Sequence, residues 1–362
     1  MSNTRGITGI IEDEVALKGA VSFARFMELA LYCPNFGYYE QQGESPGRAG
    51  DYFTSVSVGP LFGELLATRF AGWLGRMPGG ARQIVEAGAH DGRLARDILR
   101  RLQTHHPGVF ESLDYWILEP SALRRKSQEE TLGQFPGRVR WFGSWNELPS
   151  SGVHGVIFSN ELLDAMPVHR LGWDARAQKW FEWGVTLEKG HFAWTKLSRP
   201  EEGVPIPVLP EKLLAVLPDG FTTEACPAAV VWWRRAAEAL RVGKLLAFDY
   251  GLTAEQFFAP ERRDGTLRAY FRHHATADVL ARPGEQDLTA SVNFSVIRDA
   301  GESAGLTTEI FATQAQFLTE IAAGLAGDPK NQEWLAASAR QFQTLTHPEH
   351  LGRTFRVLVQ AC

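Results

Sequence analysis

Three polar side chains that could do chemistry lie close together near the middle of the chain. Asn160 and Glu161 directly follow an apolar run, and Asp164 comes three residues later. At this spacing, Glu161 and Asp164 would share one face of a helical turn. An amide and two carboxylates grouped in this way can bind a ligand through hydrogen bonds. We therefore predict Asn160, Glu161 and Asp164 as catalytic residues.

Helix capping is the structural alternative for the same stretch. Ser159 or Asn160 could cap a helix whose first turn favours acidic residues. Capping accounts for one or two of the polar residues. It does not account for Pro167, which ends the run at once.

The residues before Asn160 indicate how such a site would be positioned. Residues 153–158 are rich in small and apolar side chains, which is typical of a buried parallel strand. In an open α/β sheet, ligands bind outside the carboxyl ends of the strands. The polar residues would therefore lie where such sheets usually carry their sites.

A glycine-containing turn from Glu86 to Gly92 forms a second candidate site. The residues before it are typical of a strand end, and those after it have helical periodicity. Gly88, Ala89 and Gly92 would let a ligand approach the backbone closely, with amide hydrogens pointing at it. The dinucleotide fingerprint GxGxxG is not matched, because His90 takes the place of a middle glycine. A tight strand-to-helix turn without a ligand remains the alternative.

Two further stretches complete a nucleoside-binding half of an α/β sheet. The predicted strand YWIL is followed by Glu119 and Pro120, and a carboxylate at this place is suited to accept hydrogen bonds from a ribose. The next short strand is followed by Ser144 and Trp145 in a loop positioned to cover an adenine.

The N-terminal part is expected to form helices around a long loop. Apolar residues recur at helical spacing from Val15 to Leu31, and a second helix is expected from about Pro60 to Leu74. The loop between them is rich in glycine and aromatic residues, and a loop of that length is usually a lid, a binding segment or disordered. At its end, Asp51, Thr54 and Ser55 could reach a ligand.

The remainder is expected to mix hairpins with further α/β elements. Residues 170–197 alternate apolar and polar residues, which predicts antiparallel hairpins. A helix and a buried strand ending at Asp249 follow, and then a mostly irregular insert. The adjacent His273 and His274 would point to different sides of any regular element, so we expect no metal site there. A helix, a strand, a helix and a closing strand end the chain.

Composition bounds the function and the location. The chain has 362 residues, a net charge of −5 and three widely spaced cysteines. This charge does not suggest a general nucleic-acid binder, and the cysteines form no zinc motif and suit a reducing compartment. No segment has the apolar length needed to span a bilayer, so we expect a cytoplasmic protein with no membrane partner. The oligomeric state is left open, with a homodimer among the options.

Several motifs, in order along nearly the whole chain, resemble the MidA-like family, which includes the mitochondrial complex I assembly-factor arginine methyltransferases. The motifs are GYY (37–39), GDYFTS (50–55), FGELLA (62–67), EAGAHDGRLARDIL (86–99), SNELLDAMPVHR (159–170), FDYG (248–251) and PGEQDLTASVNF (283–294).

The resemblance implies an α/β class I methyltransferase fold, with a Rossmann-like sheet and S-adenosyl-L-methionine as cofactor. It places Asn160 and Glu161 near the transferred methyl group and a protein arginine as the acceptor. Together with the loop residues described above, we expect this cofactor to be contacted by Asp51, Thr54, Ser55, Glu86, Gly88, Ala89, Gly92, Glu119, Pro120, Ser144, Trp145 and Asn160. We expect an N-terminal helical cap and lid loop over residues 1–80. A methyltransferase core would cover residues 81–362, with insertions at about 170–220 and 252–292.

Two departures from the family pattern keep other functions open. His90 stands where the family usually has a second glycine, and Val56-Ser57 where it has a Pro-Glu pair. A small-molecule methyltransferase and a cofactor-binding assembly protein without activity are therefore alternatives. A nicotinamide-dependent oxidoreductase is disfavoured by the spacing of Gly88 and Gly92.

Overall fold

The computed structural model describes residues 6–41, 54–78, 80, 82–272, 274–276 and 278–362. These residues form two compact units. We call Ser45–Leu163, Trp232–Gly251 and Val296–Cys362 the sheet unit, and Met1–Glu44, Asp164–Val231 and Leu252–Ser295 the hairpin unit. This division differs from the expected boundary near residue 80, because residues before 45 group with both predicted insertions.

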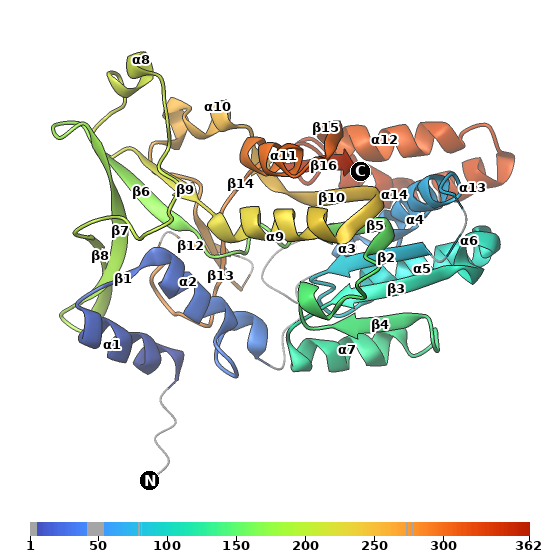
Figure 1. The fold of residues 1–362 in the computed structure, drawn as a ribbon, viewed down its shortest axis with the longest axis horizontal. Coiled ribbons are helices and arrows are strands. Elements are labelled where there is room, and N and C mark those ends of the chain that lie inside the picture. Colours follow the sequence, from blue (N-terminus) through green and yellow to red (C-terminus); the bar gives the residue numbers. More distant parts are fainter. Residues whose placement is uncertain (1–5, 42–53, 79, 81, 273, 277) are drawn as a thin grey trace, which may run out of the picture. The chain divides into compact units, whose positions relative to one another are not determined.

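A mixed sheet forms the centre of the sheet unit, in the order β15-β16-β10-β5-β2-β3-β4 (Figure 1). Its strands are β2 (Arg82–Ala87), β3 (Leu113–Leu118), β4 (Val139–Phe142), β5 (Val153–Asn160), β10 (Leu240–Leu252), β15 (Thr307–Thr313) and β16 (Phe355–Ala361). The strands from β10 to β4 are parallel, whereas β16 is antiparallel to both β10 and β15. β2 and β5 are buried along nearly their whole length because parallel strands are covered on both faces. The predicted α/β fold is confirmed.

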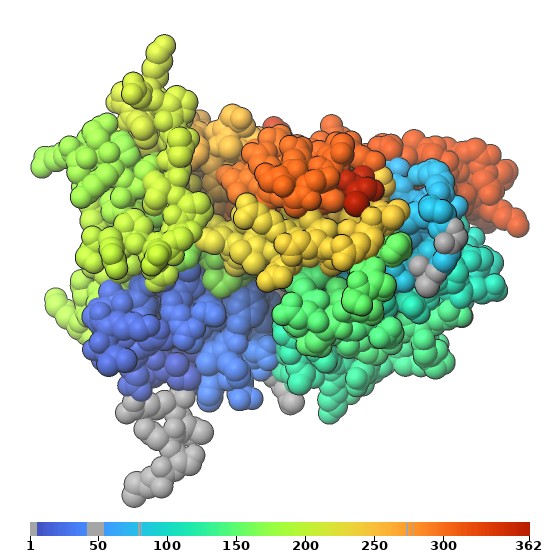
Figure 2. Space-filling model, viewed as in Figure 1, coloured from blue at the N-terminus to red at the C-terminus, as the bar shows by residue number. Residues whose placement is uncertain are grey.

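Helices pack on this sheet and supply its core. They are α3 (Ser55–Val58), α4 (Leu61–Leu74), α5 (Arg93–His105), α6 (Pro107–Glu111), α7 (Ala122–Leu132), η2 (Trp145–Glu147), α9 (Pro227–Ala239), α11 (Phe294–Ser303), α12 (Gln314–Leu325), α13 (Pro329–Ala337) and α14 (Ala339–Thr346). Phe70 of α4 packs on Phe158 of β5, and Phe317 of α12 packs on Phe248 of β10. Figure 2 shows α9 in yellow and α11 in orange side by side, where Trp233 approaches Gly301.

The hairpin unit contains the predicted antiparallel hairpins. Its elements are α1 (Ile7–Lys18), β1 (Val21–Ser22), α2 (Phe23–Tyr32), η1 (Tyr38–Glu40), β6 (His169–Asp174), β7 (Lys179–Glu188), β8 (His191–Lys196), α8 (Glu211–Leu214), β9 (Thr222–Ala225), α10 (Ala254–Phe257), η3 (Pro260–Arg262), β11 (Arg268–Phe271), β12 (His274–Thr276), β13 (Asp287–Thr289) and β14 (Val292–Asn293). One sheet has the order β1-β7-β6-β9, with β8 paired to β7. Most of the described residues in the insert after β10 lie outside helices and strands, as predicted, but β12, β11 and β13 form a small sheet there that was not predicted.

Two other expectations need correction. The single helix expected from Val15 to Leu31 is split into α1 and α2. Gly19, with a φ of +79°, ends α1, and the side chain of Ser22 caps α2 by accepting a hydrogen bond from the amide of Arg25. The helical turn expected between Glu161 and Asp164 does not form, and residues 161–168 make bends and turns instead. Among the described helices, none is both long and apolar enough to cross a bilayer.

Candidate functional site

Three parallel strands end side by side and bring the predicted motifs together. The register pairs the last residue of β2 with the last residue of β3 and with the next-to-last residue of β5. Gly88 and Glu119 therefore leave the sheet at the same edge as Asn160. Since neighbouring strands lie about 4.8 Å apart, Glu119 and Asn160 flank the glycine turn at roughly 10 Å from each other across β2.

The glycine turn has a backbone that requires its glycines. Gly88 has φ +71° and Gly92 has φ +80°, values that residues with a Cβ rarely adopt. A Cβ on Gly88 would lie 2.9 Å from Cδ1 of Leu162, and one on Gly92 would lie 3.3 Å from Cα of Gln128. The amide of Gly92 donates to the carbonyl of Ala89 at 2.8 Å. The turn is therefore a tight backbone cradle just before the N-terminus of α5.

His90 fits this turn although it replaces a glycine. Its φ is +50°, a strained value for a residue with a side chain. Its Nε2 lies 3.1 Å from Nη1 of Arg124, which can only donate. Burial, helped by the charge of Arg124, lowers the pKa of His90, so the neutral ring accepts from Arg124. Oδ1 of Asp91 accepts a hydrogen bond from the amide of Arg93, the first residue of α5, at 3.1 Å.

Glu119 is held by α7. Its side chain is buried, Oε1 accepts from the amide of Ser121 at 3.0 Å, and Oε2 accepts from Nε2 of Gln128 at 3.0 Å. Pro120 beside it is exposed. Sequence reasoning missed Gln128, although Ser121, Arg125 and Gln128 share one helix face at i, i+4 and i+7.

Asn160 and Glu161 form a tight pair at the end of β5. Nδ2 of Asn160 donates to Oε1 of Glu161 at 2.9 Å, and the amide of Ser55 donates to the same oxygen at 3.3 Å. Glu161 has φ +53°, and its amide is bound to the carbonyl of Phe248 at 2.9 Å. Within the described residues, Oδ1 of Asn160 is buried and has no hydrogen-bond donor. A strained, fixed backbone with a buried acceptor is typical of functional sites.

The turn after Glu161 is shaped by an acid whose role was not predicted. Oδ2 of Asp249 accepts from the amides of Leu162 and Leu163 at 3.2 and 2.9 Å, and Asp249 is fully buried. Its signal in the sequence was an acid at the predicted end of a buried strand, as for Glu119, although β10 continues past Asp249 to Leu252. Asp164 begins a segment of the hairpin unit, where it is 1% exposed and its carbonyl accepts from Ala290. Its catalytic role stays a prediction.

The end of the long N-terminal loop is only partly described. Asp51 lies outside the described residues. Thr54 caps α3 and forms a capping box with Ser57. Ser55 is buried, and its hydroxyl donates a hydrogen bond to Oε1 of Gln314. Of the three residues predicted in this loop, Ser55 contacts the Asn160–Glu161 pair.

Ser144 and Trp145 lie in the loop after β4, the strand beside β3. Ser144 is exposed and donates to Glu147 at 3.2 Å. Trp145 packs edge-to-face on Trp232, with ring centroids 5.5 Å apart. An aromatic side chain next to the strand end that carries Glu119 is suited to contact a nucleobase.

Glu86 faces the interior of the sheet unit. It is 2% exposed, and the hydroxyl of Tyr115 donates to its Oε2 at 2.5 Å. Burial raises the pKa of Glu86 to about 8, against the opposing effect of the Tyr115 hydrogen bond. The carboxyl group is therefore mostly protonated at neutral pH.

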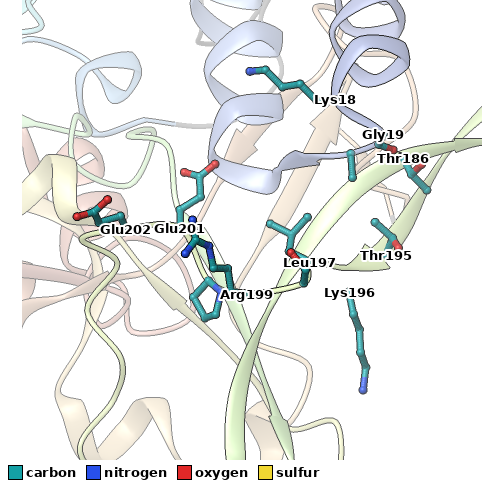
Figure 3. Close-up of a pocket in the computed structure, with 12 residues that line it drawn as sticks. Lys18, Gly19, Thr186, Thr195, Lys196, Leu197, Arg199, Glu201 and Glu202 are labelled. Carbon is teal, nitrogen blue, oxygen red and sulfur yellow. Dashed lines mark hydrogen bonds between the residues drawn. The ribbon is translucent and has the colours of Figure 1, made fainter.

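The hairpin unit holds a separate polar region. A cavity of about 480 Å³ is lined by Lys18, Lys196, Arg199, Glu201 and other residues, and Figure 3 shows the two lysines extending away from each other. Near it, His169, Glu182 and Glu201 place ligand-type atoms within 4.8 Å of one another. Both oxygens of the buried Glu182 already accept hydrogen bonds, from His169 Nδ1 and from the amide of Glu201, each at 2.7 Å. These bonds account for the cluster as a structural hydrogen-bond network.

The residues of the sheet unit fit the nucleoside cofactor that the motifs imply. Three features follow one another along a single sheet edge. The first is the glycine turn, whose cradle a Cβ would obstruct; the second is the buried carboxylate of Glu119 after the next strand; the third is the indole of Trp145 beyond it. This order matches a methionine part, a ribose and an adenine. Gly88 and Gly92, then Glu119, then Trp145 would hold them.

Comparisons with known proteins agree with this assignment. The sequence signature of a family of S-adenosyl-L-methionine-dependent methyltransferases matches residues 65–312. The mitochondrial protein arginine methyltransferase NDUFAF7 of Rattus norvegicus is 26% identical over 93% of this chain and 80% of its own length. The Drosophila melanogaster homolog is 26% identical over 94% and 81%.

A solved structure shows the same architecture. A Burkholderia thailandensis protein crystallised with bound S-adenosyl-homocysteine superposes with a TM-score of 0.84 at 34% identity, covering 98% of this chain and 92% of its own. A native crystal structure from the same organism gives a TM-score of 0.80 at 33% identity, covering 98% and 91%.

Proposed function

Because the chain belongs to this family of S-adenosyl-L-methionine-dependent methyltransferases, we propose that it methylates a side-chain nitrogen of a protein, with arginine as the acceptor. The observation that carries the acceptor assignment is the Asn160–Glu161 pair at the end of β5, beside the cofactor cradle. The relatives of this chain are named protein arginine methyltransferases, which supports the same acceptor.

The chemistry places two demands on the protein. When bound, the cofactor supplies an electrophilic methyl group on a sulfonium. The acceptor nitrogen must present a lone pair in line with that group, since alignment supplies much of the rate enhancement. A guanidinium is protonated at neutral pH and must therefore lose a proton as it is methylated.

Asn160 and Glu161 meet these demands in complementary ways. Glu161 is held in place by Ser55 and Asn160, and a fixed carboxylate pairs strongly with a guanidinium and can accept its proton. Oδ1 of Asn160, a buried acceptor without a donor among the described residues, aligns an N–H of the same group. Glu161 thus orients the nucleophile and takes its proton, and Asn160 aligns it.

Neither departure from the family pattern removes this machinery. His90 takes the left-handed backbone of the turn and binds Arg124. Ser57 completes the capping box of α3, which holds the neighbouring Ser55 against Glu161. These contacts favour an active enzyme over a scaffold that only binds the cofactor.

The test is a comparison of Glu161→Gln with the wild-type protein. Transfer of labelled methyl from S-adenosyl-L-methionine into the protein fraction of a lysate should fall by roughly 10²-fold or more. The affinity for S-adenosyl-homocysteine, measured by calorimetry, should stay nearly unchanged. Glu130→Gln, an exposed change on α7, serves as the matched control.

Three outcomes would contradict the proposal. Equal loss of transfer and affinity in Glu161→Gln would mean that Glu161 acts on the cofactor. Label found only in small metabolites would identify a small-molecule methyltransferase. Tight cofactor binding by the wild-type protein with no transfer to any fraction would identify a non-catalytic assembly protein.

We also propose a cytoplasmic location, which cell fractionation would test.

A further inference from the structure

The side chain of Gln128 contacts both the glycine turn and Glu119. It lies on α7 and is fully buried. Its Nε2 donates to the carbonyl of His90 and to Oε2 of Glu119, each at 3.0 Å. Its Oε1 accepts from Nε1 of Trp141 at 3.0 Å.

This network fixes the orientation of the Gln128 amide. A flipped amide would turn its oxygen toward two acceptors and its NH2 toward the indole N–H, which can only donate. All three hydrogen bonds would then be lost in a buried place, where unmade bonds are costly. Trp141 therefore sets the direction in which Gln128 donates.

The two groups that Gln128 joins are the parts expected to hold the cofactor. The glycine turn would contact the cofactor through its backbone atoms, so side chains outside the turn must fix its position. The hydrogen bond from Gln128 to the carbonyl of His90 does this. The carboxylate of Glu119 is turned by Gln128 on one oxygen and by Ser121 on the other. The direction in which a carboxylate faces decides whether it meets both hydroxyls of a ribose.

We propose that Gln128 is a positioning residue for the cofactor, which holds the glycine turn and the Glu119 carboxylate in the arrangement that binds the nucleoside. Gln128 does not touch the cofactor in this role. The proposal rests on the cofactor site and not on the identity of the methyl acceptor, so it can fail independently of the proposed function.

Gln360 provides a matched control. It is also fully buried, its Oε1 accepts from Nε1 of Trp233 at 2.8 Å, and its Nε2 donates to Arg298 O and Thr308 Oγ1, each at 2.9 Å. It lies on β16, which is separated from β2 in the sheet order by β10 and β5. Like Gln128→Met, Gln360→Met removes hydrogen bonds to an indole N–H and to a backbone carbonyl, with a hydroxyl in place of the carboxylate, at a position away from the cofactor cradle.

The experiment measures the affinity for S-adenosyl-homocysteine by calorimetry. We expect Gln128→Met to weaken binding about tenfold or more, as for loss of a hydrogen bond to a charged group, whereas Gln360→Met should change it less than about twofold. In activity assays, the KM for S-adenosyl-L-methionine should rise while kcat at saturation changes little. In the Glu119→Gln background, Gln128→Met should weaken binding by a smaller factor than it does in the wild-type protein, because only its effect on the glycine turn remains.

Two further variants keep the test decisive if Gln128→Met does not fold. Trp141→Phe releases the Gln128 amide and should weaken binding in the same direction, by a smaller factor. Gln128→Glu places a second carboxylate beside Glu119, so affinity relative to wild type should recover as acid protonates the pair. Equal weakening by Gln128→Met and Gln360→Met, or no weakening by any Gln128 or Trp141 variant, would overturn the proposal.

Discussion

Replacing Glu86 with Gln should remove a large pH dependence of stability. Burial raises the pKa of Glu86 from 4.5 to about 8 in the folded protein, while the carbonyl oxygen of a Gln side chain can still accept the Tyr115 hydrogen bond. Gln cannot ionise. The variant therefore keeps the packing and the hydrogen bond and loses only the titration.

Whether the protein gains or loses stability as the pH rises depends on whether the folded or the unfolded state binds the Glu86 proton more tightly. Because the folded pKa is raised, the folded protein retains a proton that the unfolded chain loses. The stabilisation is fully present below about pH 4.5, decreases as the pH rises and is lost by the folded pKa of about 8. At about 1.4 kcal/mol per pKa unit, the whole window is worth about 5 kcal/mol. Between about pH 5 and pH 7.5 the expected loss is about 3 kcal/mol.

Urea denaturation of the wild-type protein and Glu86→Gln at a series of pH values measures this effect. The difference in the free energy of unfolding between the two proteins cancels the other titrating groups and should change by about 3 kcal/mol over that range. Tyr115→Phe, which removes a hydrogen bond that lowers the pKa of Glu86, should move the change to higher pH. Glu130→Gln controls for the exchange itself. A difference that does not vary with pH would refute the reasoning.

Two further predictions concern the shape of the site. Gly92→Ala should destabilise the protein by about 1–2 kcal/mol, because Ala must adopt a φ near +80°. It should also weaken binding of S-adenosyl-homocysteine. Unchanged stability and affinity would show that the turn relaxes freely. Asp249→Ala should destabilise by roughly 2–3 kcal/mol, because the buried amides of Leu162 and Leu163 lose their acceptor, and it should reduce methyl transfer more than cofactor affinity. Calorimetry and label-transfer assays measure both, and an Asp249→Ala variant with full transfer would separate that acid from the position of Glu161.

The sequence alone determined the residues that stand at strand ends and the types of element that hold them. Three local patterns were enough for this: the apolar run before Asn160, the glycine pair in the turn and the acid at Glu119. The structure has a strand or a turn at each of these places, as expected. Periodicity and turn chemistry depend on neighbours along the chain, so one sequence suffices to read them.

Tertiary structure alone decided which groups meet. Gln128 reaches Glu119 and His90 because α7 packs against the glycine turn, and Asp249 reaches the turn after Glu161 because β10 pairs with β5. The helical turn expected at Glu161 failed because the amides after it bind Asp249 rather than a helical partner. These contacts join residues 9 to 86 positions apart. They are set by strand register and helix packing, which leave no periodic trace in the sequence.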